Sequence, residues 1–151
     1  MQEHIVVAKI LLVHPHEPKL LLLRRSSTDP RRPGQWDIPG GKFEPYQDRL
    51  PFNASIRECQ EEAGIVIGPD DLNFLTADHE EFHDADPKVV DWLFYFAKSG
   101  TDQVELSYEH DDFSWVEPSE ALSGMLSYAR HIKIFEFALK SGALKRYKIS
   151  A

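Results

Sequence analysis

The sequence predicts an α/β protein of the α+β kind, in which a mixed β-sheet is sandwiched between α-helices. Short apolar runs rich in β-branched and aromatic residues stand on both sides of one central amphipathic stretch. A second amphipathic stretch lies near the end of the chain. Strands on both sides of a helix, with more helix behind them, are expected to share one layered core.

Length and composition limit the functions to consider. The 151 residues, 42% hydrophobic and 28% charged, are expected to form a single domain over residues 1–151. The net charge of −8 repels nucleic acid phosphates, so we expect no duplex nucleic acid partner. The lone cysteine, Cys59, excludes an internal disulfide, and we recognise neither a signal peptide nor a membrane-spanning run. The expected location is cytoplasmic, without a membrane partner.

The first part of the chain predicts extended structure. Residues 5–13 are nearly all apolar and β-branched, which predicts a strand buried on both faces. Residues 14–18 form a turn, and residues 19–25 return as the hairpin partner. Residues 26–34 are a loop, and residues 35–39 are a short extended piece that leads into a glycine pair.

The second part of the chain adds three strands and two helices. Aromatic and β-branched runs predict strands over residues 72–76, 89–97 and 113–116. Helix signals cover residues 117–126 and 128–140, and the last residues are expected to be a weakly ordered tail.

Residues 51–63 form the central predicted helix. Pro51 is tolerated in a first turn, Asp48 is a candidate cap, and Gly64 is a natural stop. At 100° per residue one face is apolar, and it consists of Phe52, Ile56, Cys59 and Ala63. We therefore expect Cys59 to be a buried, inert thiol.

Three glutamates are expected on roughly the opposite side of this helix. Glu58, Glu61 and Glu62 are spaced i, i+3 and i+4, so their charges repel one another. A divalent cation would remove this repulsion and turn the cluster into a site.

The residues around this helix resemble the Nudix box, the loop–helix signature of the Nudix hydrolases. The matching residues are Gly40-Gly41, Glu44, Arg57-Glu58-x-x-Glu61-Glu62-x-Gly64-Ile65, and the flanking Trp36-Asp37-Ile38-Pro39 and Phe113-Ser114-Trp115-Val116. The resemblance implies a Nudix-type fold and the cleavage of a diphosphate linked to another moiety. Such a reaction needs charge neutralisation on phosphate oxygens, an oriented water and a base.

The resemblance also implies roles for the box residues. Glu58 and Glu62 are expected to be direct metal ligands, and Glu61 a further ligand or the base that activates water. The carbonyl of Gly41 is expected to complete the metal shell, and Arg57 to orient an acidic partner. The implied cofactor is Mg²⁺, with Mn²⁺ left open as a replacement.

The box departs from the family pattern in its loop. The gap between the glycine and Arg57 is two residues too long, and the usual loop glutamate is absent. We expect either Asp48 or Glu44 to take its place as the partner of Arg57. A further acid is expected from a late loop, with Glu109 as the first candidate and Asp111 and Asp112 as rivals.

Substrate contacts are expected from the basic loop and its neighbours. The candidates are Arg24, Arg25, Arg31, Arg32, Trp36 and Lys42. The simpler interpretation is a solvated basic loop and a packed tryptophan.

A second motif, His79-Glu80-Glu81-Phe82-His83, matches the H-E-x-x-H pattern of zinc proteases. Its flanks favour a loop or strand end over a helix, and no third ligand is evident, so we expect no zinc chemistry.

The predicted function is Mg²⁺-dependent pyrophosphohydrolysis of a small nucleotide, either a nucleoside triphosphate or another nucleoside diphosphate derivative. The first alternative is a catalytically weak nucleotide-binding or regulatory protein of the same fold. The second is an interaction module with solvated glutamates. A homodimer is left open.

Overall fold

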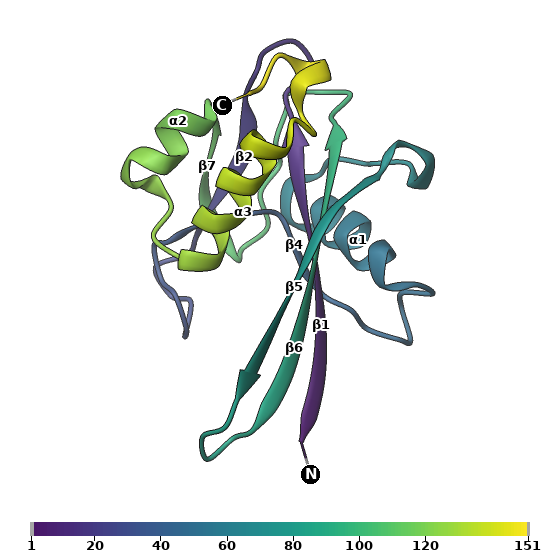
Figure 1. Cartoon of the computed structure of the whole chain (residues 1–151), viewed down its shortest axis with the longest axis vertical. Coiled ribbons are helices and arrows are strands. Elements are labelled where there is room, and N and C mark those ends of the chain that lie inside the picture. The colour runs from purple at the N-terminus through teal and green to yellow at the C-terminus, as the bar shows by residue number, and fades with distance from the viewer. Residues whose placement is uncertain (1, 151) are drawn as a thin grey trace.

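The computed structural model describes residues 2–150 and contains one seven-stranded mixed sheet (Figure 1). The strands are β1 (Glu3–Val13), β2 (Leu20–Arg25), β3 (Trp36–Asp37), β4 (Gly40–Lys42), β5 (Asn73–Phe82), β6 (Lys88–Lys98) and β7 (His110–Val116). The main path runs β3-β2-β1-β6-β5, while β4 pairs with β1 and β7 pairs with β2. β1 and β6 are parallel along their whole length, and the other pairs are antiparallel.

Helices cover both faces of this sheet. The longer ones are α1 (Pro51–Ala63) and α3 (Ala129–Ser141), and the shorter ones are α2 (Pro118–Glu120), η1 (Pro69–Asp71), η2 (Ala121–Met125) and η3 (Lys145–Tyr147). α1 lies on one side of the strands, and α2 and α3 lie on the other (Figure 1). This arrangement confirms the predicted sandwich.

β1 holds the two layers of the core together. Ile10 and Leu12 pack with Cys59 of α1, whereas Leu11 and Val13 pack with Phe135 of α3. Alternate residues of a strand point to opposite faces, so a strand between two helical layers is apolar at nearly every buried position, with Lys9 as the exception in β1. The predicted strand with two buried faces is confirmed.

Three local predictions are corrected. The strand expected over residues 72–76 continues to Phe82, because β6 pairs with it throughout. The helix expected over residues 117–126 is broken at Gly124, whose φ is 123°. The tail is ordered through Ser150, since Leu144 and Ile149 are buried in the core.

Within residues 2–150, no helix is both long enough and apolar enough to cross a bilayer.

Candidate active site

The glycine pair passes very close to β1 and α1. At Gly40, φ is 130°, and a Cβ would lie 2.3 Å from the carbonyl oxygen of Ala8. At Gly41, a Cβ would lie 2.7 Å from Cδ of Glu58. Gly40 is therefore required by the backbone of β1, whereas a side chain at Gly41 would displace the Glu58 carboxylate.

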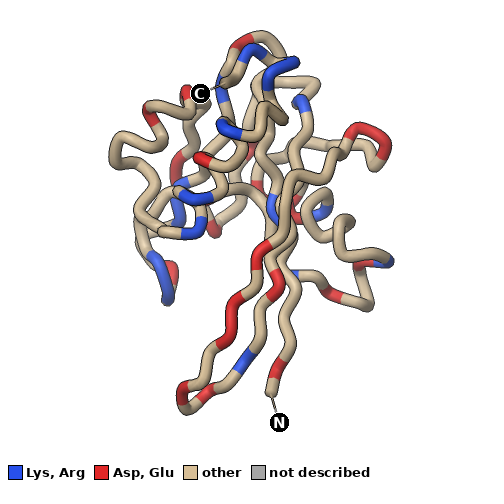
Figure 2. The backbone as a smooth tube through the Cα atoms, viewed as in Figure 1, with Lys and Arg blue, Asp and Glu red and all other residues tan. Residues whose placement is uncertain are grey.

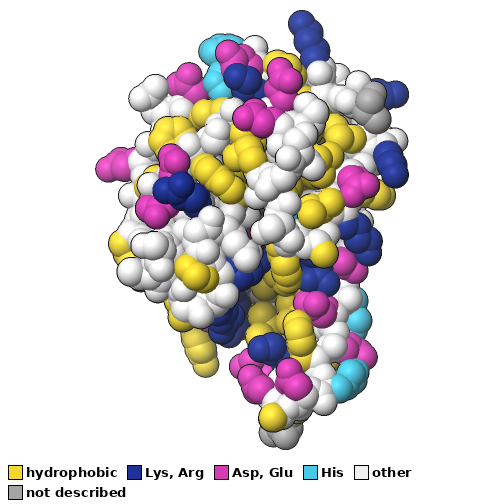
Figure 3. All heavy atoms as spheres, turned by 90° about the vertical axis from the view of Figure 1, so that its left-hand side faces the viewer, with side chains coloured by type: hydrophobic (Ala, Val, Ile, Leu, Met, Phe, Trp, Pro, Cys, Tyr) yellow, Lys and Arg dark blue, Asp and Glu magenta, His cyan; other side chains and the backbone are white. Residues whose placement is uncertain are grey.

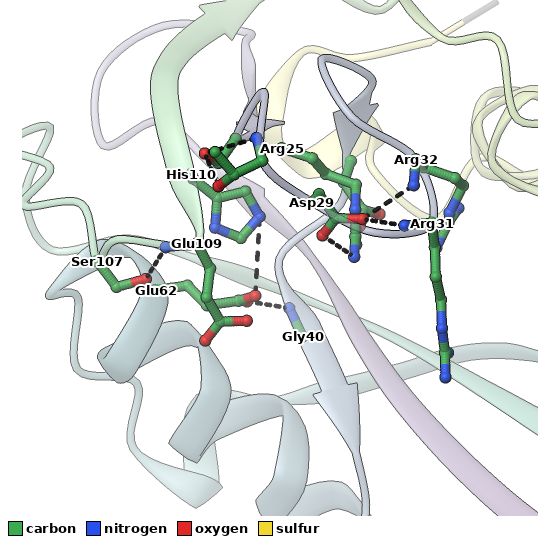
Figure 4. Close-up of polar contacts among 12 residues, drawn as sticks. Arg25, Asp29, Arg31, Arg32, Gly40, Glu62, Ser107, Glu109 and His110 are labelled. Carbon is green, nitrogen blue, oxygen red and sulfur yellow. Dashed lines mark hydrogen bonds and ion pairs between the residues drawn. The ribbon is translucent and has the colours of Figure 1, made fainter.

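Glu62 lies under this segment. It is only 6% exposed, and its Oε1 accepts a hydrogen bond from the Gly40 N–H at 2.9 Å. Nε2 of His110 lies 3.9 Å from the other carboxylate oxygen, as Figure 4 shows. Burial raises the pKa of Glu62 to about 8. The expectation that all three glutamates point away from the buried face is therefore wrong for Glu62, because the Gly40 segment covers that part of α1.

Glu58 and Glu61 lie on either side of Arg57. The guanidinium Nη1 is 3.2 Å from an oxygen of Glu58 and 3.2 Å from an oxygen of Glu61. Burial raises the pKa of Glu58, and the charges of Glu61 and Glu109 act in the same direction. Cys59, between them in sequence, is fully buried as predicted, and burial raises its pKa to about 12, which disfavours the reactive thiolate.

Asp48 is the acidic partner of Arg57. It accepts from Nε at 2.8 Å and from Nη2 at 3.0 Å, and it also accepts from the backbone N–H of Glu44 at 2.8 Å. Arg57 holds the pKa of Asp48 below its ordinary value. Because Asp48 is used in this way, it does not cap α1, whose N-cap is Leu50 without a side-chain bond.

Of the late acidic residues, Glu109 is the one directed at α1. In Figure 4 its carboxylate extends down toward Glu62 and the helix. Asp111 instead accepts a hydrogen bond from Nε of Arg24 at 2.8 Å, and Asp112 lies 3.9 Å from the same guanidinium. This geometry favours Glu109 over its two rivals.

A buried polar cluster, the Asp37 cluster, supports the glycine pair from behind. Its members are Lys9, Arg25, Asp37 and His131. Lys9 donates to the carbonyls of Ile38 and Gly40 at 3.0 and 3.2 Å, and lies 3.3 Å from Asp37.

Two further members of the cluster reach Asp37 from distant elements. His131 Nε2 lies 2.6 Å from Oδ1, and Arg25 donates to Oδ2 at 2.8 Å. Burial opposes ionisation of Asp37, but the charge of Lys9 and the bond to His131 hold its pKa well below the usual range. Neither this cluster nor His110 was predicted from the sequence. The signal for the cluster is Lys9, a lysine inside an otherwise apolar strand.

The basic loop is divided between structural and exposed arginines. Arg25 bridges Asp37 and Asp29, and the backbone N–H groups of Arg31 and Arg32 each donate to Asp29 at 2.9 Å (Figure 4). Arg24 is paired with Asp111. Arg25 therefore holds the loop, whereas Arg24 links β2 to β7, so carboxylates already occupy both guanidinium groups.

The other substrate candidates lie nearer to solvent. The guanidinium of Arg32 lies 4.2 Å from the ring centroid of Tyr128, which was not predicted as a site residue. Trp36 is partly buried against the core, with the Arg24 guanidinium 5.9 Å from its ring centroid. Lys42 is exposed, and its carbonyl accepts from Arg57 at 3.1 Å.

The H-E-x-x-H stretch lies on a strand and its end, not on the helix that the zinc-protease pattern requires. His79 lies within β5 and is bonded to Asp91 at 2.6 Å, and Arg130 holds Glu80 at 3.0 Å. A strand cannot place residues i and i+4 as a helix does. Within residues 2–150, no three His, Cys, Asp or Glu side chains converge as a metal site.

The donors around Gly41 nevertheless fit a hard divalent cation. Arg57 lies 3.2 Å from an oxygen of Glu58 and 3.2 Å from an oxygen of Glu61. Burial raises the pKa of both Glu58 and Glu62 although Arg57 lies beside Glu58 and the charge of Lys9 acts on Glu62, so these two cations compensate the carboxylates only in part. Carboxylate and carbonyl oxygens are the ligands that Mg²⁺ prefers.

The fold and this acidic loop–helix site define a class of hydrolase, and comparison with known proteins agrees. The NUDIX domain family model matches residues 3–136. The chain is 31% identical over 117 residues to a Caenorhabditis elegans bis(5'-nucleosyl)-tetraphosphatase [asymmetrical], which covers 76% of this chain and 75% of that protein. It is 30% identical to the crystal structure of the MutT protein from Methanosarcina mazei Go1, with a TM-score of 0.72 and coverage of 89% and 92%.

A C. elegans Ap4A hydrolase binary complex has the same fold, with a TM-score of 0.65, 24% identity, and coverage of 94% of this chain and 98% of that one. The chain therefore belongs to the Nudix family, and it is a hydrolase that acts on diphosphate bonds.

Proposed function

We propose that the protein is a Mg²⁺-dependent pyrophosphohydrolase of small nucleotides that carry a polyphosphate chain. The observation that carries the proposal is the buried Glu62, held by the Gly40 N–H beside Glu58. Such a carboxylate pair is costly to bury unless a cation compensates it.

Each part of the site then has a task. Glu58, Glu62 and the carbonyl of Gly41 are the proposed ligands, with Glu61 as a further ligand or the base. A bound Mg²⁺ supplies charge neutralisation on the phosphate oxygens. Glu109 approaches from the turn before β7 and completes the acidic surface, and Arg57 restrains Glu58 and Glu61 through Asp48. The Asp37 cluster keeps the glycine segment rigid.

The substrate is proposed from the surroundings and from the named relative. The similar C. elegans protein is named as a dinucleoside tetraphosphatase, and we place dinucleoside polyphosphates beside nucleoside triphosphates as candidates. Arg31, Arg32 and Lys42 are the proposed phosphate contacts. Figure 3 shows exposed hydrophobic side chains with Lys and Arg side chains among them. They lie between the part of the molecule that carries the helices and the protruding ends of β1, β5 and β6 (Figure 1). Arg32 covers the aromatic ring of Tyr128, with its guanidinium 4.2 Å from the ring centroid.

The test is product release from diadenosine tetraphosphate, ATP, dGTP and ADP-ribose, with Mg²⁺, with Mn²⁺ and with EDTA. Anion-exchange separation of the products shows which P–O–P bond is cleaved. We expect hydrolysis to require the metal and to fall by about 100-fold or more in Glu62→Gln, because a ligand is lost. The matched control is Glu136→Gln, an exposed glutamate of α3. Full activity in EDTA, or in Glu62→Gln, contradicts the proposal.

A further inference from the structure

Two adjoining hollows lie in the surface at the end of β1 and β6 remote from the glycine pair. Their volumes are about 360 Å³ and 520 Å³, and both are lined by Lys98, Arg146 and Tyr147. Val13 lines the smaller hollow, and the residue of β1 that pairs with Gly40 is Lys9. Four residues of strand span roughly 13 Å, so these hollows are separate from the proposed hydrolysis site.

The smaller hollow is rich in cations that have no carboxylate partner. Its lining includes Lys98, Arg146, Lys148 and His16. Within residues 2–150, no ion pair involves Lys98, Arg146 or Lys148. The acidic residue of the lining, Glu17, is itself paired with Lys19 at 3.0 Å. Figure 2 shows Lys and Arg gathered at this end of a chain whose net charge is −8.

The turn that carries these cations is held firmly. Leu144 and Ile149, which flank η3, are buried, and Tyr147 packs edge-on against Phe96 with a centroid distance of 6.4 Å. The Arg146 guanidinium lies 5.5 Å from the same Phe96 ring. The two aromatic rings thus contact the Arg146 guanidinium itself, and within residues 2–150 its N–H groups donate no hydrogen bond, so they are available to the hollow.

Lys148 occupies a conformation that favours glycine. Its φ is 64°, the one positive φ of a non-glycine residue within residues 2–150, and its N–H donates to the carbonyl of Lys145 at 2.9 Å. Side chains with a β-carbon rarely adopt this conformation. At this φ a glycine would have a lower conformational energy than a lysine. The presence of a lysine therefore points to a binding role for its ammonium group.

We propose that the smaller hollow binds a short polyphosphate chain, either free or as part of a nucleotide, without a metal ion. Arg146 offers a planar fork that matches phosphate oxygens, and Lys98 and Lys148 offer point charges on the same hollow. The cationic side chains lie at separate places around the smaller hollow, so together they suit an anion whose negative charges are spread along a chain. The site is independent of the hydrolysis proposed above.

The test is calorimetric titration of the whole protein with inorganic tripolyphosphate in the presence of EDTA. We expect saturable binding that weakens by about fivefold or more in Arg146→Ala and in Lys148→Gly. The matched control is Lys140→Ala, which removes an exposed lysine of α3 at the same end but outside both hollows. Its affinity should stay within about twofold of wild type.

Lys148→Gly separates binding from folding. Glycine adopts a positive φ without strain, so the melting temperature should be unchanged or higher while binding weakens. Absence of binding in wild type, equal weakening in Lys140→Ala, or loss of binding in Arg32→Ala overturns the proposal. Glu62→Gln should bind normally even though it has lost hydrolysis. If ATP competes with tripolyphosphate under the same conditions, the ligand of the smaller hollow is a nucleotide. If ATP does not compete, the ligand is free polyphosphate.

Discussion

Arg57 donates two hydrogen bonds to Asp48, a residue nine positions earlier, at 2.8 and 3.0 Å. Asp48 is almost fully buried and belongs to the lengthened loop before α1. The loop therefore returns a carboxylate to Arg57 although the usual loop glutamate is missing. Arg57 in turn contacts both Glu58 and Glu61.

We expect Asp48→Asn to weaken catalysis by releasing Arg57 toward the glutamates. A freed guanidinium competes with a cation for Glu58 and Glu61, so the Mg²⁺ concentration for half-maximal rate should rise and kcat should fall by about tenfold. The free energy of unfolding should fall by about 2 kcal/mol. Rate measurements over a Mg²⁺ series, with urea unfolding, check both effects. Glu44→Gln is the control, and a larger effect there would argue against the pairing with Asp48.

Gly40→Ala and Gly34→Ala compare two glycines with positive φ. At Gly34 an added Cβ meets nothing within 4 Å, so the cost should be the conformational strain alone, about 1 kcal/mol. At Gly40 the Cβ collides with the backbone of β1, and the loss should exceed about 3 kcal/mol. Urea unfolding of both variants decides the point. Equal costs would mean that the close approach to Ala8 does not constrain this loop.

Asp29 should make the free energy of unfolding depend on pH in the acidic range. Burial opposes its ionisation, but bonds from the N–H of Arg32, from the Arg25 side chain and from the N–H of Arg31 lower its pKa to about 2. The pKa is depressed in the folded state, so the stabilisation is present above the unfolded value near 3.8 and is lost as pH falls toward 2. Asp29→Asn should cost about 2 kcal/mol at pH 7 and almost nothing near pH 2. Thermal unfolding across this range measures the difference, and a constant difference refutes the assignment.

Arg32→Ala and Arg25→Ala should separate substrate binding from loop support. Arg32 lies over Tyr128, so its loss should raise KM by about tenfold and change stability by less than about 1 kcal/mol. Arg25 bridges Asp29 and Asp37, so its loss should destabilise the fold by about 3 kcal/mol or more. Steady-state kinetics and urea unfolding distinguish the two outcomes. A KM effect from Arg25→Ala without loss of stability would reverse these roles.

Local sequence determined the helix and the main strand. Pro51 and Gly64 bound α1 as predicted, and the apolar run of β1, interrupted by Lys9, specified burial on both faces. These features depend on residues close together in the chain, through backbone geometry and periodicity. The spacing of Glu58, Glu61 and Glu62 likewise marked the candidate site.

The tertiary structure alone decided which polar groups meet. The bond of Glu62 to Gly40 joins residues 22 positions apart, and the bond of His131 to Asp37 joins residues 94 apart. Periodicity assigned Glu62 to the solvent side, but the glycine segment covers that side and compensates the buried carboxylate. Sequence spacing does not encode such pairings, because a buried polar group is stabilised by whichever partner the packing brings near it.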